Sequence, residues 1–391
     1  MKIASRMENL SPSVTMAITA LARELKAQGK DILSFSAGEP DFDTPEVIKE
    51  AAIKAIKDGH TKYTAVEGTI ETKKAIIKKL KTDHGLDYDL DEIIVSNGAK
   101  HSLFNLFQCL IEKGDEVIIP APYWVTYPEQ VKFSDGVPVF IETDDSTQFK
   151  ITAEQLKAAI TDKTKVLLLN TPSNPTGAVY TKEELLALGE VLKGTDILVF
   201  TDEMYEKIMY DKEKFTAVAS VSDDMFQRTV TINGISKAVA MTGWRYGYIA
   251  TPHKALVKAM IKLQGQVTSN VNSVTLQAAV AALDGSADAD IENMRKEFEK
   301  RRDVAVDSFN AIEGISCLAP QGAFYLFVSI KDIGADSMKF SADLLEKEGI
   351  AVVPGLAFGT EGYFRFSFAT DLPTIEEGIR RIRKFVEENY S

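Results

Sequence analysis

The chain has few residues of the types that most often bind zinc or form disulfides. Its 391 residues include only two cysteines, Cys109 and Cys317, and four histidines, and no His-Glu-x-x-His sequence occurs. Cys109 lies in an apolar run, where a buried, reduced thiol is expected. We therefore expect no metal site, and we expect acid–base chemistry to rest on residues other than histidine.

The chain also lacks an excess of basic charge and a long hydrophobic run. Lys and Arg number 45 against 57 Asp and Glu, so the net charge is −12. This acidic balance argues against nucleic-acid and anionic-membrane partners, which require basic patches. No apolar run approaches the roughly 20 residues that cross a bilayer, and the N-terminus does not resemble a signal peptide. The sequence predicts a cytoplasmic protein and leaves small anionic ligands open.

Length and patterning indicate a globular chain with two domains. A chain of 391 residues exceeds the roughly 250–300 that one hydrophobic core usually supports. Between residues 92 and 251, short continuous apolar runs alternate with amphipathic stretches. Such runs are typical of strands buried on both faces and connected by helices. We therefore expect an α/β domain with a mostly parallel sheet.

The pattern changes after residue 289. A long charged amphipathic stretch over 290–312 predicts a bridging helix, and strand-like runs follow at 323–328, 351–353 and 363–368. Thr374 and Glu377 form a capping-box pattern that predicts the start of the last helix. We predict three segments: an N-terminal arm and part of the small domain over 1–40, a large α/β domain over 41–289, and a C-terminal small α+β domain over 290–391.

Two common nucleotide-binding sequences are absent, since neither Gly-x-Gly-x-x-Gly after a strand nor a P-loop occurs. Polar residues instead follow the predicted strands at their carboxyl ends, where open α/β sheets bind ligands. Each has an ordinary alternative when taken alone: a turn for 170–177, a helix cap for Asp202, a solvated charge for Lys237, and a solvent-facing strand position for Arg365.

Taken in order, these motifs resemble the pyridoxal-phosphate-dependent aminotransferases of fold type I, class I. The set comprises Ser-Asn-Pro-Thr-Gly at 173–177, Asp202-x-x-Tyr205, Ser236-Lys237, Gly243-Trp244-Arg245 and Arg365. The stretches 36–45, 121–128 and 240–245 resemble the bacterial aspartate aminotransferases often called subgroup Ib. The resemblance runs from about Ser5 to Phe385. It implies fold type I, with a mostly parallel seven-stranded sheet in the large domain and a smaller α+β domain.

The resemblance implies a role for each residue around the cofactor ring. Lys237 would form a Schiff base with pyridoxal 5′-phosphate and move the proton of the reaction, which suits lysine because its pKa falls in a desolvated, cationic site. Asp202 would keep the pyridine nitrogen protonated. Tyr205 and Asn174 would donate hydrogen bonds to the phenolate oxygen of the cofactor, and Trp124 would stack on the ring.

The resemblance also implies a phosphate site. Gly98, Ala99 and Lys100 open a helix directly after a strand, so that their backbone N–H groups can face an anion. Ser236 and Arg245 would add a hydroxyl and a guanidinium. A tyrosine of the partner subunit reaches the phosphate in this family, and Tyr63 stands in that motif, which implies a homodimer.

The substrate residues follow in the same way. Arg365 would bind the α-carboxylate through two hydrogen bonds, with help from the backbone N–H of Gly38, and Trp124 and Asn174 would complete the site. Lys100 would bind the distal carboxylate of an acidic amino acid, or it would lie near the phosphate or on the helix surface. Ser11 stands where prephenate-accepting relatives carry a basic residue. The stretch 68–73 departs from the family at a helix start, and we expect it to leave the chemistry intact.

The expected activity is transfer of the amino group of L-aspartate to 2-oxoglutarate, which forms oxaloacetate and L-glutamate by ping-pong half-reactions. The alternatives are an aminotransferase of the same subgroup with prephenate, aromatic or alanine specificity, and a pyridoxal-phosphate-dependent β-lyase. A non-catalytic regulator built on the same fold would need a DNA-binding segment, and the acidic charge offers no phosphate-binding surface for one.

Overall fold

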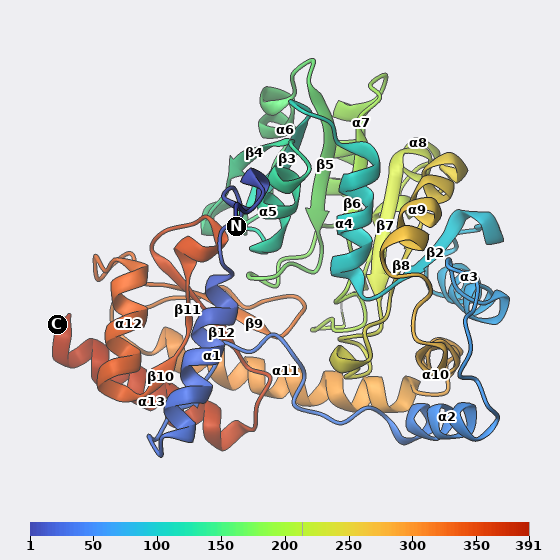
Figure 1. Ribbon diagram of the computed structural model, residues 1–391. Helices are drawn as coiled ribbons and strands as arrows, with labels where there is room; N and C mark the ends of the chain where they lie inside the picture. The colour runs from blue at the N-terminus through green and yellow to red at the C-terminus, as the bar shows by residue number, and fades with distance from the viewer. Residues whose placement is uncertain (213, 391) are drawn as a thin grey trace.

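A mostly parallel sheet of seven strands forms the core of the larger lobe in the computed structural model, which describes residues 1–212 and 214–390 (Figure 1). Only β8 runs antiparallel to its neighbours β2 and β7, and the other neighbouring strands are parallel. The strands lie in the order β2 (Ile93–Ser96), β8 (Gly247–Ala250), β7 (Thr229–Gly234), β6 (Leu198–Asp202), β5 (Thr164–Asn170), β3 (Glu116–Ala121) and β4 (Val137–Glu142). This arrangement confirms the predicted fold class.

Helices cover both faces of this sheet because its central strands are apolar on both sides. In β5, Leu168 packs in one core with Phe107 of a helix on one face, whereas Leu167 packs with Leu185 and Leu188 of a helix on the other. Alternate strand residues point to opposite faces, so a continuous apolar run requires two helical layers. The helices of this lobe are α2 (Glu46–Lys57), α3 (Ile70–His84), α4 (Ala99–Leu110), α5 (Thr126–Phe133), α6 (Ala153–Ala159), α7 (Lys182–Leu192), α8 (Asp223–Arg228), α9 (Lys254–Val267) and α10 (Ser273–Leu283).

The smaller lobe combines the two ends of the chain. Near the N-terminus, β1 (Leu33–Ser34) pairs in parallel with β10 (Ile350–Ala351). An antiparallel sheet has the order β11 (Val353–Pro354), β12 (Tyr363–Ser367) and β9 (Tyr325–Ser329). The lobe also contains α1 (Val14–Ala27), α12 (Ser337–Glu348) and α13 (Leu372–Asn389). The predicted boundaries at residues 40 and 289 stay predictions, and Ser391 lies outside the described residues.

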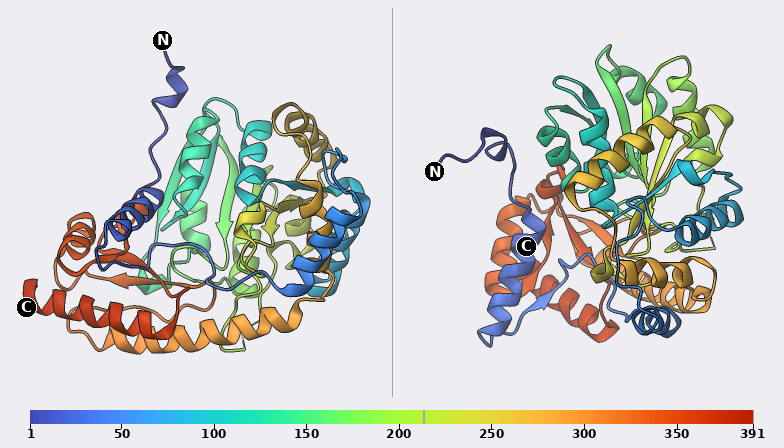
Figure 2. Two further views of the ribbon diagram at one scale, coloured as in Figure 1. Left: turned by 60° about the horizontal axis from the view of Figure 1, so that its bottom comes forward. Right: turned by 45° about the vertical axis from the view of Figure 1, so that its right-hand side comes forward.

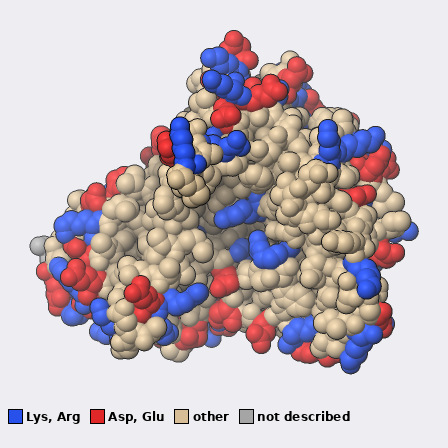
Figure 3. All heavy atoms as spheres, viewed as in Figure 1, with Lys and Arg blue, Asp and Glu red and all other residues tan. Residues whose placement is uncertain are grey.

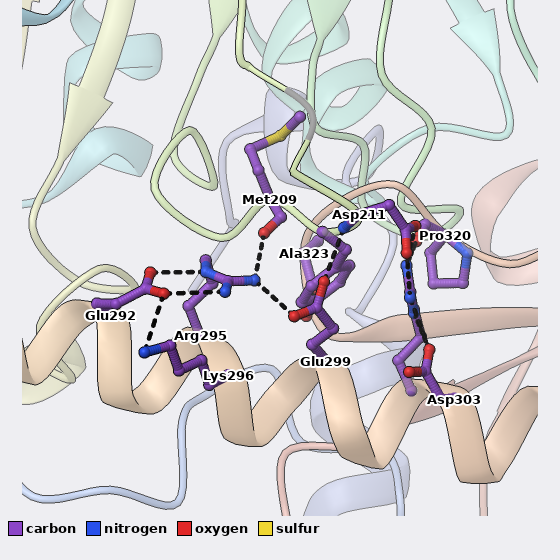
Figure 4. A network of polar contacts seen from close by, with 11 residues as sticks. Met209, Asp211, Glu292, Arg295, Lys296, Glu299, Asp303, Pro320 and Ala323 are labelled. Atoms are coloured by element: carbon purple, nitrogen blue, oxygen red, sulfur yellow. Dashed lines mark hydrogen bonds and ion pairs between the residues drawn. The ribbon is translucent and has the colours of Figure 1, made fainter.

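One long helix, α11 (Asp288–Asn310), runs below both lobes (Figure 1). It covers most of the stretch 290–312, which the sequence predicted to be a bridging helix. Its polar face holds the chain that follows β6 (Figure 4). Arg295 Nη1 donates to the carbonyl oxygen of Met209 at 3.2 Å, and the Asp211 N–H donates to Glu299 Oε1 at 2.7 Å. Arg302 adds an ion pair with Asp211 at 2.5 Å. The first turns of the helix are therefore fastened to the larger lobe.

Some local expectations were wrong. The last helix begins at Leu372 with Asp371 as its N-cap, which accepts from the N–H of Thr374 at 3.0 Å. Pro373 suits the first turn of a helix, where its missing N–H leaves nothing unpaired. Glu377 therefore pairs with Arg380 and Arg381 instead of closing a capping box with Thr374.

The strand expected over 351–353 is two short strands, β10 and β11, which pair with different partners in the smaller lobe. The chain changes partner at Val352, which is buried between them. The apolar runs indicated neither β1 nor β8, because β1 is two residues long and β8 begins with glycine.

The first residues extend away from both lobes before α1 begins (Figure 2). Met1, Ile3 and Met7 are exposed in this arm. Among the described residues, none of the helices has the length and apolar character needed to cross a membrane.

Candidate active site

A cavity of about 440 Å³ lies where the carboxyl ends of β5 and β6 meet the smaller lobe. Lys and Arg side chains are visible in the hollow at the centre of the molecule (Figure 3). Most of the predicted site residues line the cavity: Gly38, Ala99, Lys100, Trp124, Asn174, Asp202, Tyr205, Ser236, Lys237, Arg245 and Arg365. Gly98 lies directly behind Arg245. Tyr63 does not line the cavity; it lies in the loop before α3, where it is 90% exposed.

Lys237 follows β7 and reaches into the cavity from the larger lobe. Its Nζ donates a hydrogen bond to the carbonyl oxygen of Gly38, on the segment that crosses between the lobes. Burial lowers the pKa of Lys237 to about 8; Glu39 opposes this shift, and the cations Arg365 and Arg245 add to it. A fraction of this amine is therefore neutral near pH 7, as a nucleophile or proton acceptor requires.

Asp202 ends β6 with its carboxylate in the cavity and is 5% exposed. The hydroxyl of Tyr127 donates to Oδ2 at 2.8 Å, and the N–H of Met204 donates to Oδ1 at 3.3 Å. Burial raises the pKa of Asp202 to about 6, although the Tyr127 hydrogen bond and Lys237 both favour the ionised form. A desolvated carboxylate of this kind is stabilised by a cation placed in contact with it.

Arg365 and Asn174 are joined from opposite lobes. Arg365 Nη1 donates to Asn174 Oδ1 at 2.8 Å, and Nη2 donates to the carbonyl oxygen of Ser36 at 2.8 Å. This assigns the amide oxygen of Asn174, so its NH₂ group is free to donate elsewhere in the cavity. Arg365 is 2% exposed, and its Nε is buried without a partner among the described residues. A guanidinium held in this way can bind a carboxylate.

The start of α4 forms an anion site beside Arg245. Gly98 is the N-cap residue, with φ of 86°, and a Cβ at this position would collide with the Arg245 guanidinium. The positive φ therefore favours glycine, and the absence of a side chain leaves room for the guanidinium. The His101 N–H donates to the carbonyl oxygen of Gly98 at 3.0 Å, whereas the N–H groups of Ala99 and Lys100 precede the first carbonyl partner of the helix and are available to an anion. Ser236 lines the same cavity.

Trp124 precedes α5 and lies between two other cavity residues. Its ring meets that of Tyr127 edge-on, with the ring centroids 5.3 Å apart. Lys100 Nζ lies 4.9 Å from the centroid of the indole ring. Burial, with a smaller contribution from Arg245, lowers the pKa of Lys100. Lys100 therefore lines the cavity beside Trp124, although the residue as a whole is exposed, and its role stays a prediction.

The sequence did not single out several polar residues of the cavity, among them Tyr127, Tyr325, Glu39 and Thr242. Tyr127 lies within the 121–128 motif, but nothing in the motif showed that it would contact Asp202. Tyr325 lies in the apolar run 323–328, where an aromatic residue is expected in the core. Thr242 Oγ1 donates to Glu39 Oε2 at 2.8 Å, a contact between residues about 200 apart in the chain that no local pattern signals.

A second, larger groove of about 590 Å³ lies on the smaller lobe between α1, α12 and α13. Its Arg381 is paired with Asp31 at 2.6 Å, and its Lys384 is paired with Glu348 at 2.8 Å. Both of these cations are therefore already neutralised by an acidic partner.

The cavity residues fit pyridoxal phosphate. Among the described residues, no cation forms an ion pair with the desolvated Asp202, and a protonated ring nitrogen would supply one. The α4 N-terminus with Arg245 suits a phosphate. Lys237 offers an amine of lowered pKa between these two sites. The donor set therefore matches each polar end of this cofactor.

Comparison with known proteins identifies the family of the chain. Residues 30–382 match the family described as aminotransferase class I and II. The aspartate aminotransferase of Geobacillus stearothermophilus is 49% identical over 99% of both chains. The aspartate/prephenate aminotransferase of Nitrosomonas europaea is 48% identical, over 98% of this chain and 99% of the other. The crystal structure of the Rhizobium meliloti aspartate aminotransferase superposes with a TM-score of 0.95 at 44% identity, over 98% of each chain. The chain belongs to the class I and II aminotransferase family.

Proposed function

We propose that the protein is a pyridoxal-phosphate-dependent aminotransferase that moves the amino group of L-aspartate to 2-oxoglutarate, forming oxaloacetate and L-glutamate. One observation carries the proposal: a single cavity holds the Lys237 amine, the desolvated Asp202 carboxylate and the Arg365 guanidinium. The names of similar proteins, among them the Geobacillus stearothermophilus and Rhizobium meliloti aspartate aminotransferases, support aspartate as the amino donor.

Asp202, Tyr205 and Asn174 would hold the cofactor ring. When bound, pyridoxal phosphate supplies an aldehyde that accepts the amino group and a ring that withdraws electrons from the substrate α-carbon. Asp202 would keep a proton on the ring nitrogen. Tyr205 and the NH₂ group of Asn174 would donate hydrogen bonds to the phenolate oxygen, and Trp124 would stack on the ring.

Lys237 would attach the cofactor and then carry the proton. Its lowered pKa leaves a neutral amine available near pH 7. Lys237 would take the proton from the substrate α-carbon and would deliver it to the C4′ atom of the cofactor. A flexible amine suits this role because one side chain can both accept and donate the proton.

The phosphate and the two substrate carboxylates would use separate cations. Arg245, Ser236 and the N–H groups of Ala99 and Lys100 would bind the phosphate, with Gly98 leaving room for Arg245. Arg365 and the N–H of Gly38 would bind the α-carboxylate. The Lys100 ammonium would bind the distal carboxylate of aspartate, which an uncharged amino acid lacks.

We also propose a homodimer in which Tyr63 of each subunit reaches the phosphate in the partner's site. Tyr63 is 90% exposed within one chain, and Ile56 and Ile70, on α2 and at the start of α3, are also exposed. Exposed apolar residues on the helices that flank Tyr63 in the chain are suited to a protein interface. A cytoplasmic location stays a prediction.

The amino donor can be tested by absorbance. Aspartate is expected to remove the visible absorbance of the bound cofactor, and 2-oxoglutarate is expected to restore it. Lys237→Ala serves as the blank. If phenylalanine or alanine removes the absorbance and aspartate does not, the aspartate specificity is wrong. Release of pyruvate or ammonia without an oxo-acid acceptor would show a β-lyase instead.

The distal carboxylate site needs a separate variant. Lys100→Ala is expected to raise the KM for aspartate by roughly 10- to 100-fold and to leave turnover of phenylalanine nearly unchanged. Lys57→Ala, on the exposed end of α2, is the matched control and is expected to change neither value. An equal effect of Lys100→Ala on both amino acids would place Lys100 at the phosphate.

A further inference from the structure

We propose that Tyr325 is a positioning residue that links the carboxylate-binding Arg365 to Tyr205, through its ring on one side and its hydroxyl on the other. The proposal rests on the proposed function, because it takes Arg365 and Tyr205 as the substrate and cofactor residues. Tyr325 comes from the smaller lobe and Tyr205 from the larger one, so the contact joins the two lobes inside the cavity.

The ring of Tyr325 supports the guanidinium. The Cζ atom of Arg365 lies 4.4 Å from the centroid of the Tyr325 ring. The strand register explains the approach: in the antiparallel pair β9 and β12, Tyr325 lies opposite Ser367 and Arg365 lies opposite Phe327. Tyr325 and Arg365 are therefore diagonal neighbours on one face of the sheet. A cation over a desolvated aromatic ring is stabilised, and its plane is held.

The hydroxyl of Tyr325 contacts the hydroxyl of Tyr205 at 2.9 Å. Burial raises the pKa of both phenols, so each hydroxyl keeps its single proton at neutral pH. The charged groups that act on the two phenols are Arg365, Asp202 and Glu39. Either hydroxyl could donate in this pair as it stands.

The direction of donation becomes fixed when Tyr205 uses its proton elsewhere. A phenol has one proton to donate. If Tyr205 donates to the phenolate oxygen of the cofactor, the Tyr325 hydroxyl must donate to the oxygen of Tyr205. A hydrogen bond received by Tyr205 polarises it and strengthens the bond it makes. Tyr325 would therefore affect the cofactor without touching it.

The fit around Tyr325 is tight. A Cβ at Gly38 would lie 3.1 Å from the Tyr325 hydroxyl oxygen, so the crossing segment packs closely against the phenol. The carbonyl of the same glycine accepts the hydrogen bond from Lys237. Tyr325 therefore lies where the Lys237, Tyr205 and Arg365 segments meet.

Two variants of the holoenzyme separate the roles of the hydroxyl and the ring. Tyr325→Phe keeps the ring and removes the hydroxyl, whereas Tyr325→Leu removes both. The first readout is the pH midpoint of the visible absorbance of bound pyridoxal phosphate, which needs no substrate. The second is the dissociation constant of succinate, a dicarboxylate that has no amino group to transfer.

Tyr325→Phe is expected to move the midpoint upward by roughly 0.3 to 0.5 unit, because weaker donation from Tyr205 leaves the phenolate oxygen less stabilised. Its affinity for succinate is expected to stay at the wild-type value. Tyr325→Leu is expected to move the midpoint as well and to weaken succinate roughly 10-fold, because Arg365 loses its supporting ring. If Tyr325→Phe binds succinate as tightly as the wild type and Tyr325→Leu binds it more weakly, the loss of affinity is due to the missing ring.

Tyr363→Phe is the matched control. Tyr363 is a buried tyrosine of the same sheet whose hydroxyl donates to Asp145 Oδ1 at 3.1 Å, and its removal is expected to change neither readout. An unchanged midpoint in Tyr325→Phe, or unchanged succinate binding in Tyr325→Leu, overturns the proposal. The proposed function fails separately, if aspartate does not remove the absorbance of the wild-type protein.

Discussion

Asp202 and Glu203 are neighbouring acids at the end of β6, yet they lie in different surroundings. Asp202 faces the cavity, where burial raises its pKa and the Tyr127 hydroxyl and Lys237 partly oppose that shift. Glu203 is fully buried behind the sheet, where Oε1 accepts from the N–H of Val218 at 3.0 Å and from Thr201 Oγ1 at 3.2 Å. Burial raises the pKa of Glu203 to about 7 and that of Asp202 to about 6. Burial raises the pKa of both acids, but only Asp202 lies where it can contact a ligand. The two residues therefore differ in function.

The region behind the sheet continues into a closed ion network. Glu206, also behind the sheet, pairs with Lys79 and with His84 Nε2, the latter at 2.6 Å. Although burial opposes the shift, Lys79 and His84 hold the pKa of Glu206 well below its usual range. This network fixes the turn that begins at Asp202 and includes Tyr205. The charged side chains of the cavity can bind ligands. The charged side chains of Lys79, His84 and Glu206, here called the rear network, pair with one another and stabilise the fold.

The largest effect is expected from Asp202→Asn. The substitution keeps the shape of the side chain and removes the charge that would hold the ring nitrogen protonated, so kcat is expected to fall by roughly 100- to 1,000-fold. Glu203→Gln is the matched control and is expected to keep kcat near the wild-type value. Single-turnover kinetics with aspartate measure both. Equal losses in the two variants would show that the two acids do not differ in function.

Lys79→Met tests the rear network. It leaves Glu206 as a buried carboxylate with one partner fewer, so the free energy of unfolding is expected to fall by about 3 kcal/mol. Lys54→Met, which breaks the exposed pair of Lys54 with Asp58, is expected to change it by less than about 0.5 kcal/mol. Urea unfolding gives both values. If Lys79→Met lowers the free energy of unfolding no more than Lys54→Met does, the rear network does not stabilise the fold as we assign.

Glu203→Gln tests the raised pKa of Glu203. The folded pKa of about 7 lies above the value of 4.5 for the unfolded chain, so this group's stabilisation is complete below pH 4.5 and is lost as the pH rises through 7. Glutamine does not titrate. The stability of the wild type relative to the variant is therefore expected to be greater at pH 5 than at pH 8, by on the order of 2 to 3 kcal/mol. A difference independent of pH in urea unfolding would mean that Glu203 does not titrate in this range.

Tyr127→Phe is expected to have the smallest effect. The Tyr127 hydroxyl lowers the pKa of Asp202, so its removal is expected to move the acid limb of kcat/KM upward by roughly half a unit to one unit. The loss of kcat is expected to be only a few-fold, because the carboxylate remains. Tyr180→Phe, which alters a buried phenol that accepts from Ile151, is the control and is expected to leave the pH profile unchanged. An unchanged profile in Tyr127→Phe would show that its hydrogen bond does not tune Asp202.

The sequence predicted the large sheet well because its signal is local. Continuous apolar runs can be buried on both faces only in a covered parallel sheet, and the runs that end at Asn170 and Asp202 are β5 and β6. The sequence patterns did not indicate β1 or β8, and they misplaced the start of the last helix. Two-residue strands exist only through their partners, and the choice between Asp371 and Thr374 as N-cap depends on a single turn.

Most of the candidate site could also be predicted, because chemistry restricts residue type at each position. The expectation that Lys237, Asp202, Asn174 and Arg365 would meet agrees with the cavity, although their roles stay proposals. The contacts made by Tyr127 and Tyr325 could not be predicted. Each depends on a side-chain approach between segments 75 or 120 residues apart.

By itself, the sequence determined the fold class and the kinds of residue that a transaminase needs, since periodicity and residue chemistry are properties of the chain. Only the tertiary structure decided which groups are desolvated and which groups lie in contact. Asp202 and Glu203 are adjacent acids in the sequence, and they point to opposite sides, one into the cavity and the other into the buried region behind the sheet. The physical reason is that burial and distance set the pKa and reach of a side chain, and both arise only when the chain has folded.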